Sequence, residues 1–272
     1  MKPLRSVHAA VAALAFALLA APARGQRAEP RPAELEGVEI SPVPGTQVPL
    51  DRPFVDETGK AVRLGDYFGA NRPVLLNLGY YSCPMLCGLV LNALLDGLKG
   101  LSWDPGKEFE VVTISINPKE TPQLAKLKKQ NYVKAYGRPA ANRGWHFLTG
   151  REEDIRAVTD SVGFYYRYDE KSGQYAHGAA IFILTPRGVL SRAIRGVQFD
   201  PQTLRLSLAE ASEGKQGGTI DSLLLWCYHY DEESGRYSFQ AMTIMRVAGV
   251  AVLVLLAALL LPVWLRRRRT TR

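Results

Sequence analysis

The hydrophobic residues of this chain form short continuous runs that alternate with stretches of helical periodicity. Runs rich in Val, Ile and Leu predict strands at 74–80, 109–116, 178–184 and 189–194. Between them, 3.6-residue patterns predict helices at 86–98, 121–136, 151–162 and 201–211, and Thr185-Pro186-Arg187-Gly188 predicts a turn. Continuous apolar strands are typical of a sheet covered by helices on both faces, so the pattern predicts an α/β layer fold.

The two ends of the chain predict a membrane topology. Residues 1–25 have a basic start, an apolar stretch and small residues near Ala21, as in a signal peptide; an uncleaved anchor is the alternative. Residues 245–265 are almost unbroken Val, Ala and Leu, which predicts a transmembrane helix rather than a buried helix of a soluble core. The basic tail at 266–272 should stay cytoplasmic, so we expect the domain to face the periplasm from a bacterial-type inner membrane.

Between these ends the sequence predicts one globular domain at 48–229. An extended linker rich in Pro, Glu and Arg precedes it at 26–47, and a juxtamembrane segment follows at 230–244. The formal net charge is +8, but Lys2, Arg5 and the five arginines after Leu265 supply seven of it. The domain itself is therefore close to neutral, and without a basic stripe interleaved with aromatics we expect no nucleic-acid partner.

The most informative motif is Cys83-Pro84-Met85-Leu86-Cys87, at the junction of a predicted strand and a predicted helix. Unpaired N–H groups and the positive end of the helix dipole favour thiolate over thiol there. Thiolates bind soft metals or exchange disulfides, and ligands of α/β sheets bind beyond the carboxyl ends of the strands. The structural alternative is a pair of small buried hydrophobic residues.

A third donor would decide between these chemistries, and His177 directly precedes the predicted strand at 178–184. If that strand neighbours the one ending at Tyr80, the imidazole can face Cys83 and Cys87. Two thiolates and one imidazole suit copper, whereas zinc more often takes a fourth protein ligand. The structural alternative for an isolated histidine is a satisfied core residue.

These residues resemble the Sco/SenC family. The resemblance covers roughly residues 47–211 and includes the thiol pair, the segment Ser115–Pro122, the stretch Trp145–Gly150 and His177. It implies a thioredoxin-like fold with an extra hairpin, and one copper ion bound by Cys83, Cys87 and His177. It also implies a metallochaperone rather than an enzyme, acting in assembly of the dinuclear copper site of cytochrome c oxidase. The implied partner is the oxidase subunit that carries this site, or another copper carrier.

Two departures from the family pattern concern neighbours of the ligands. This chain has Asn117-Pro118 where many relatives have Asp-Pro, and Ala176 where many have an acidic residue before the histidine. The alternative function is that of a thiol–disulfide oxidoreductase acting on exported proteins. Such enzymes usually have two residues between the cysteines and a facing cis-proline, whereas the spacer here is three residues and no proline lies near Tyr175–Gly178.

Four further residues have weaker claims. Cys227 and His229 lie shortly before the predicted membrane helix and would share one face of an extended chain, as a second weak site or as part of an aromatic cluster. Met85 could lend a thioether to copper, although packing is the simpler role. His146 is most simply a strand residue.

Overall fold

The computed structural model describes residues 37–83, 86–212, 228–231 and 236–239, and of Leu86, Cys87 and the last two segments it describes the backbone alone. The predicted signal peptide, the linker up to residue 36, most of the juxtamembrane segment and the predicted transmembrane helix lie outside these residues. Within the described part, no helix is long and apolar enough to cross a membrane.

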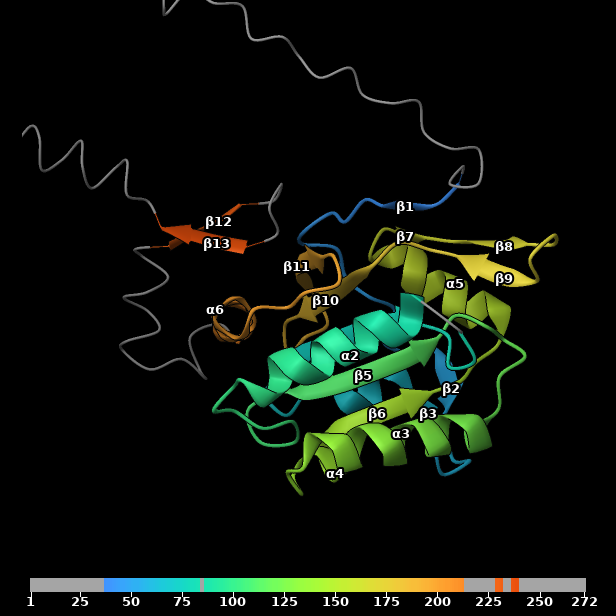
Figure 1. The fold of residues 1–272 in the computed structure, drawn as a ribbon, viewed down its shortest axis with the longest axis horizontal. Helices are drawn as coiled ribbons and strands as arrows, with labels where there is room; N and C mark the ends of the chain where they lie inside the picture. Colours follow the sequence, from blue (N-terminus) through green and yellow to red (C-terminus); the bar gives the residue numbers. More distant parts are fainter. Residues whose placement is uncertain (1–36, 84–85, 213–227, 232–235, 240–272) are drawn as a thin grey trace, which may run out of the picture. The chain divides into compact units, whose positions relative to one another are not determined.

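The centre of the domain is a five-stranded mixed sheet in the order β11-β10-β4-β5-β6 (Figure 1). Its strands are β4 (Val74–Gly79), β5 (Glu110–Ser115), β6 (Trp145–Leu148), β10 (Ala180–Leu184) and β11 (Leu190–Arg195). β4, β5 and β6 run parallel, and β10 pairs antiparallel with both β4 and β11. The α/β prediction is confirmed, and each predicted strand appears with bounds shifted by at most two residues.

Alternating side chains of the central strands enter two separate cores. On β4, Leu76 and Leu78 enter one core with helix α5 (Glu152–Ser161), and Leu75 enters the other with helix α2 (Leu86–Lys99). The second core also contains residues of α3 (Pro122–Tyr136), α4 (Ala141–Gly144) and α6 (Pro201–Ala211). Because the sheet is covered on both faces, its three inner strands β10, β4 and β5 are buried along their whole length.

Local capping explains where two of the flanking helices, α3 and α6, begin. α3 starts after Thr121, whose side-chain oxygen accepts a hydrogen bond from Leu124 N–H, and Pro122 occupies the first turn. The same helix ends at Gly137 in the left-handed region, at φ 80°. α6 begins in the same way as α3, with Asp200 as its N-terminal cap directly before Pro201.

Several short elements were not predicted from the pattern. They are β1 (Glu39–Ile40), β2 (Pro53–Val55), β3 (Ala61–Arg63), the 3₁₀ helix η2 (Leu64–Tyr67), β7 (Phe164–Tyr165), β8 (Arg167–Asp169), β9 (Gln174–Ala176), β12 (Tyr228–Asp231) and β13 (Arg236–Phe239). β8 pairs with β9 as a hairpin that ends directly before His177. β1 pairs with β7, although β1 lies in the segment expected to be a linker. Strands of two or three residues are too short to show a period in sequence.

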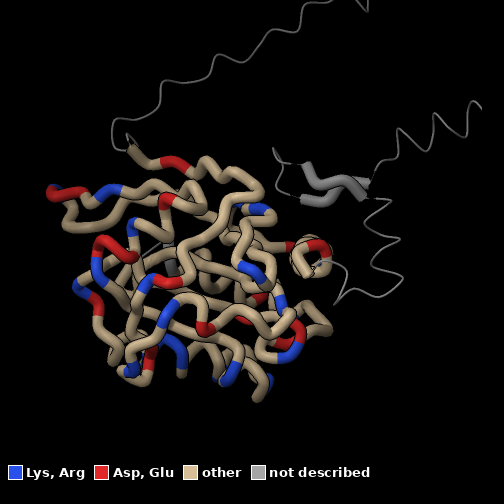
Figure 2. Tube along the Cα trace, turned by 180° about the vertical axis from the view of Figure 1, so that it is seen from behind, with Lys and Arg blue, Asp and Glu red and all other residues tan. Residues whose placement is uncertain are grey.

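Positions of Lys and Arg are interspersed with positions of Asp and Glu along the described part of the chain (Figure 2). This distribution agrees with a domain that is close to neutral once the charges of the two chain ends are set aside.

Candidate metal centre

Cys83 lies in the turn that follows strand β4. Its backbone N–H donates a hydrogen bond of 3.4 Å to the carbonyl oxygen of Tyr80, and its side chain is half-buried against the core that contains α5. Cys87 is in the first turn of α2, as the sequence predicted, and its side chain is outside the description. The thiol motif therefore spans a strand-to-helix turn at the carboxyl end of the parallel strands.

The register between β4 and β10 brings His177 to the same end of the sheet. Asn77 pairs with Ile181 in antiparallel fashion. Continuing this register three residues along β4 places Tyr80 opposite Gly178, with His177 one residue beyond. The expectation that the strand after His177 neighbours the strand ending at Tyr80 is thus confirmed.

The His177 ring is held in one orientation. The residue is only 7% exposed, and its Nδ1 lies 2.8 Å from the carbonyl oxygen of Gly178. Because a carbonyl oxygen can only accept, Nδ1 is the protonated nitrogen and Nε2 carries the lone pair in the neutral ring. This is the arrangement typical of metal-ligating histidines, in which a backbone oxygen fixes the tautomer.

Aromatic rings surround the imidazole. The His177 ring centroid lies 6.1 Å from that of Tyr80, at an angle near perpendicular, and 5.8 Å from that of Phe164. Burial lowers the pKa of His177 below 6.5, and the hydrogen bond to Gly178 opposes this shift only in part. The neutral ring, which is the form that binds a metal, is therefore favoured.

A buried carboxylate, Glu120, fixes the turn that leads to Cys83. Its Oε2 accepts from Tyr81 N–H at 2.8 Å and from Ser115 Oγ at 2.6 Å. Its Oε1 accepts from the N–H and the hydroxyl of Ser82, both at 2.7 Å. No role of Glu120 was predicted from the sequence, although this residue lies in the segment Ser115–Pro122 that carried part of the resemblance.

A polar cleft of about 360 Å³ opens beside this turn. It is lined on one side by Tyr80 and Ser82, and on the other by Asn117, Lys119 and residues of the β8–β9 hairpin. Tyr175 of this hairpin packs against Tyr80, with 5.6 Å between ring centroids. The hairpin thus contacts Tyr80, whose ring also lies near the ring of His177.

Of the four residues with weaker claims, only His146 has a side chain that the structure describes. His146 lies in β6 and its Nε2 is 3.2 Å from Glu110 Oε2, so its prediction as a strand residue is confirmed. Met85, Cys227 and the side chain of His229 lie outside the description. Among the described side chains, which do not include that of Cys87, no three of His, Cys, Asp or Glu form a metal-binding group.

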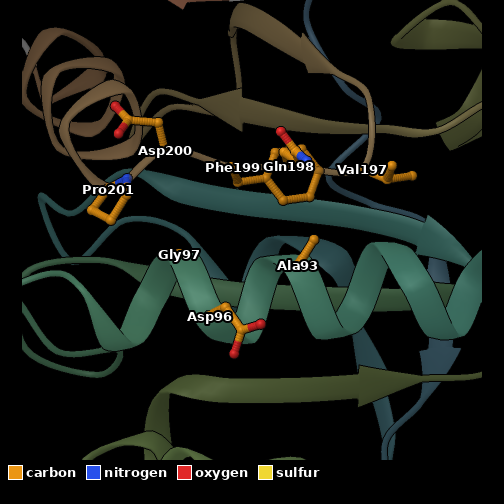
Figure 3. Close-up of a pocket in the computed structure, with 8 residues that line it drawn as sticks. All are labelled: Ala93, Asp96, Gly97, Val197, Gln198, Phe199, Asp200 and Pro201. Carbon is orange, nitrogen blue, oxygen red and sulfur yellow. The ribbon is translucent and has the colours of Figure 1, made fainter.

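A second concave surface lies between α2 and the start of α6. This groove has a volume of about 450 Å³ and is lined by Ala93, Asp96, Gly97 and residues 197–201 (Figure 3). Its charged residues are Asp96 and Asp200, and Asp200 already accepts a hydrogen bond from Thr203 N–H as the helix cap. It contains neither thiol nor imidazole, so the donor chemistry lies at the Cys83 turn.

Comparisons with known proteins agree with this fold. The SCO1/SenC family model matches residues 47–212. Among solved structures, a candidate electron transfer protein from Aquifex aeolicus VF5 is 25% identical, with a TM-score of 0.56 over 64% of this chain and 96% of that protein. A candidate electron transport protein from the same organism is 25% identical, with a TM-score of 0.52 over 64% and 100% of the two chains.

ScoI from Arabidopsis thaliana, solved with copper bound, is 21% identical with a TM-score of 0.46, over 63% of this chain and 99% of that protein. No curated protein sequence matches this chain.

Proposed function

The chain belongs to the SCO1/SenC family, and we propose that it is a membrane-tethered copper chaperone that binds one copper ion through Cys83, Cys87 and His177. It delivers this copper for assembly of the dinuclear copper site of cytochrome c oxidase. The recipient is the oxidase subunit that carries this site, or another copper carrier. The signal peptide at 1–25 and the transmembrane helix at 245–265, both predicted from the sequence, support a location of the domain on the periplasmic side of the inner membrane.

The orientation of His177 is the observation that carries this proposal. The bond from Nδ1 to the Gly178 carbonyl selects the tautomer whose Nε2 is a metal donor, and burial keeps the ring neutral. The register of β10 on β4 brings this histidine to the end of the sheet at which the chain continues into Cys83, where a metal could join the two residues.

The donor set favours copper over other metals. Thiolate is the soft ligand that selects Cu(I), and imidazole accepts both Cu(I) and Cu(II). The start of α2 supports thiolate at Cys87, because unpaired N–H groups and the helix dipole favour negative charge there. Two cysteines and one histidine therefore fit a copper ion that has to be released again to a partner.

An anaerobic Cu(I) titration of the detergent-solubilised full chain tests the proposal. We expect one copper per chain, loss of binding in Cys83→Ser and Cys87→Ser, and weaker binding in His177→Ala. Cys227→Ser is the matched control, because it removes the third cysteine and should leave binding unchanged. Unchanged affinity in the variant that lacks both Cys83 and Cys87 would refute the assignment.

Cys83 is half-buried and directly follows Ser82, which lines the polar cleft, and this position also supports a second candidate function, thiol–disulfide exchange. An oxidised Cys83–Cys87 pair could not ligate copper, so the redox state of the pair would control loading. Insulin-disulfide reduction separates the two functions. Rapid turnover by a protein that binds no copper would favour the oxidoreductase.

A further inference from the structure

Glu120 combines deep burial with an unusually complete set of donors. The residue is 9% exposed and lies between β5 and α3, two positions before the first residue of α3. Each of its carboxylate oxygens accepts one backbone N–H and one hydroxyl, at distances between 2.6 and 2.8 Å. Four donors at such distances compensate the cost of burying a carboxylate.

Two of these donors belong to the backbone that leads to the thiol motif. The N–H groups of Tyr81 and Ser82 are consecutive, and both point at the same carboxylate. Successive N–H groups that converge on one anion define a fixed backbone conformation. Since Cys83 follows Ser82 directly, the path of the chain into Cys83 is set by this contact.

The neighbouring contacts of the turn show why Glu120 matters for Cys83 in particular. The Tyr81 side chain is anchored separately, because its hydroxyl lies 2.7 Å from Leu148 O and 3.1 Å from Thr113 O. The hydrogen bond of Cys83 N–H to Tyr80 O is long, at 3.4 Å. Between these two points, the short hydrogen bonds of Ser82 all go to Glu120.

We propose that Glu120 is a positioning residue of the metal centre, which holds the turn Tyr81–Ser82 so that the Cys83 sulfur is placed for a metal shared with His177. This inference rests on the proposed function for its metal, although the anchoring of the turn can be measured without one. Residues that orient metal ligands typically change metal affinity by about 10–100-fold when they are lost.

Replacement of Glu120 by glutamine removes the charge and one acceptor oxygen but keeps the size of the side chain, so it tests the hydrogen bonds and not the packing. In either orientation of the amide, its NH₂ group would face a backbone N–H, of Tyr81 or of Ser82. A hydroxyl can rotate to accept from an amide, but a backbone N–H cannot. Glu120→Gln should therefore release one of the two backbone anchors while it preserves the volume of the side chain.

Glu57 offers a matched control within the same domain. It is also 9% exposed, and it accepts hydrogen bonds from Lys129 Nζ and Phe147 N–H, outside the Cys83 turn. Glu57→Gln thus removes a buried carboxylate without touching the turn. A difference between the two variants reports on position and not on the general loss of a buried charge.

The test uses the detergent-solubilised full chain and two measurements. The first is Cu(I) affinity by competition with a chelator, where Glu120→Gln should bind about 10–100-fold more weakly than wild type and Glu57→Gln within about twofold of it. The second is hydrogen exchange of the metal-free protein, where the Tyr81 and Ser82 amides should exchange faster in Glu120→Gln alone. Should Glu120→Gln not fold, Glu120→Asp keeps the charge but shortens the reach, and the same two shifts are expected.

Unchanged exchange at Tyr81 and Ser82 in the Glu120 variant would overturn the proposal, as would equal losses of affinity in the Glu120 and Glu57 variants. A wild-type protein that binds no copper, together with faster exchange in Glu120→Gln, would instead refute the copper function and leave the anchoring of the turn standing.

Discussion

Removing one partner of the ion pair between Lys129 of α3 and Glu57 after strand β2 should strongly destabilise this domain. Lys129 Nζ lies 2.5 Å from Glu57 Oε1, and the two side chains are only 11% and 10% exposed. The other carboxylate oxygen accepts from Phe147 N–H at 3.1 Å. One buried carboxylate therefore ties α3 and β6 to the β2–β3 hairpin.

Lys129→Met is the informative perturbation, because it keeps the aliphatic stem and removes the charge. The Glu57 carboxylate would then remain buried without its cation, which typically costs about 3–5 kcal/mol. The total unfolding free energy of a typical domain is only about 5–15 kcal/mol, so the variant should unfold at a clearly lower urea concentration than the wild type. Lys126→Met is the control, because Lys126 is exposed on the same helix and its loss should change stability by less than about 0.5 kcal/mol.

Urea denaturation of the single variants Lys129→Met and Glu57→Gln, together with the double variant Glu57→Gln/Lys129→Met, completes the measurement. Because the double variant leaves no unpaired buried charge, it should lose less than the sum of the two single losses. A loss below about 1 kcal/mol in Lys129→Met, or strictly additive losses, would refute the argument that burial makes this pair strong.

Two further predictions concern pH and packing. Because burial lowers the pKa of His177, the unfolded chain binds a proton at this imidazole more tightly than the folded protein does. The unfolding free energy of the metal-free protein should therefore fall as the pH drops from about 6.5 toward the pKa of His177 in the folded state. Thermal melts across this pH range should show this dependence of stability on pH in the wild type and lose it in His177→Gln. An identical pH dependence in both proteins would contradict the lowered pKa of His177. A Cβ at Gly144 would lie 1.9 Å from Gly106 N, so Gly144→Ala should lower the unfolding free energy by about 3 kcal/mol or more. Gly88→Ala is the control, because a Cβ at Gly88 would meet nothing within 4 Å and the change should be neutral or stabilising. Equal melting temperatures of the two variants would refute this prediction.

The pattern of apolar residues predicted the long elements well, because buried strands and capped helices have strong local signals. α3 illustrates this, since Thr121, Pro122 and Gly137 mark its limits in the sequence as they do in the structure. The β8–β9 hairpin was missed because its strands are three residues each. Its contribution to the cleft follows from Tyr175 packing on Tyr80, a contact between residues 95 positions apart that no local pattern contains.

The sequence by itself determined the chemistry available to this protein: two thiols at a strand-to-helix junction, one histidine before a later strand, and the α/β layer fold that the alternation of apolar runs requires. Only the tertiary structure decided how the described donors are placed. The antiparallel register of β10 on β4 brings His177 to the end of the strand that precedes Cys83, and the Gly178 carbonyl selects its tautomer. The role of Glu120 also arises only on folding, because hydrogen bonds that join residues 38 or 39 positions apart depend on strand pairing and leave no periodic signal in the chain.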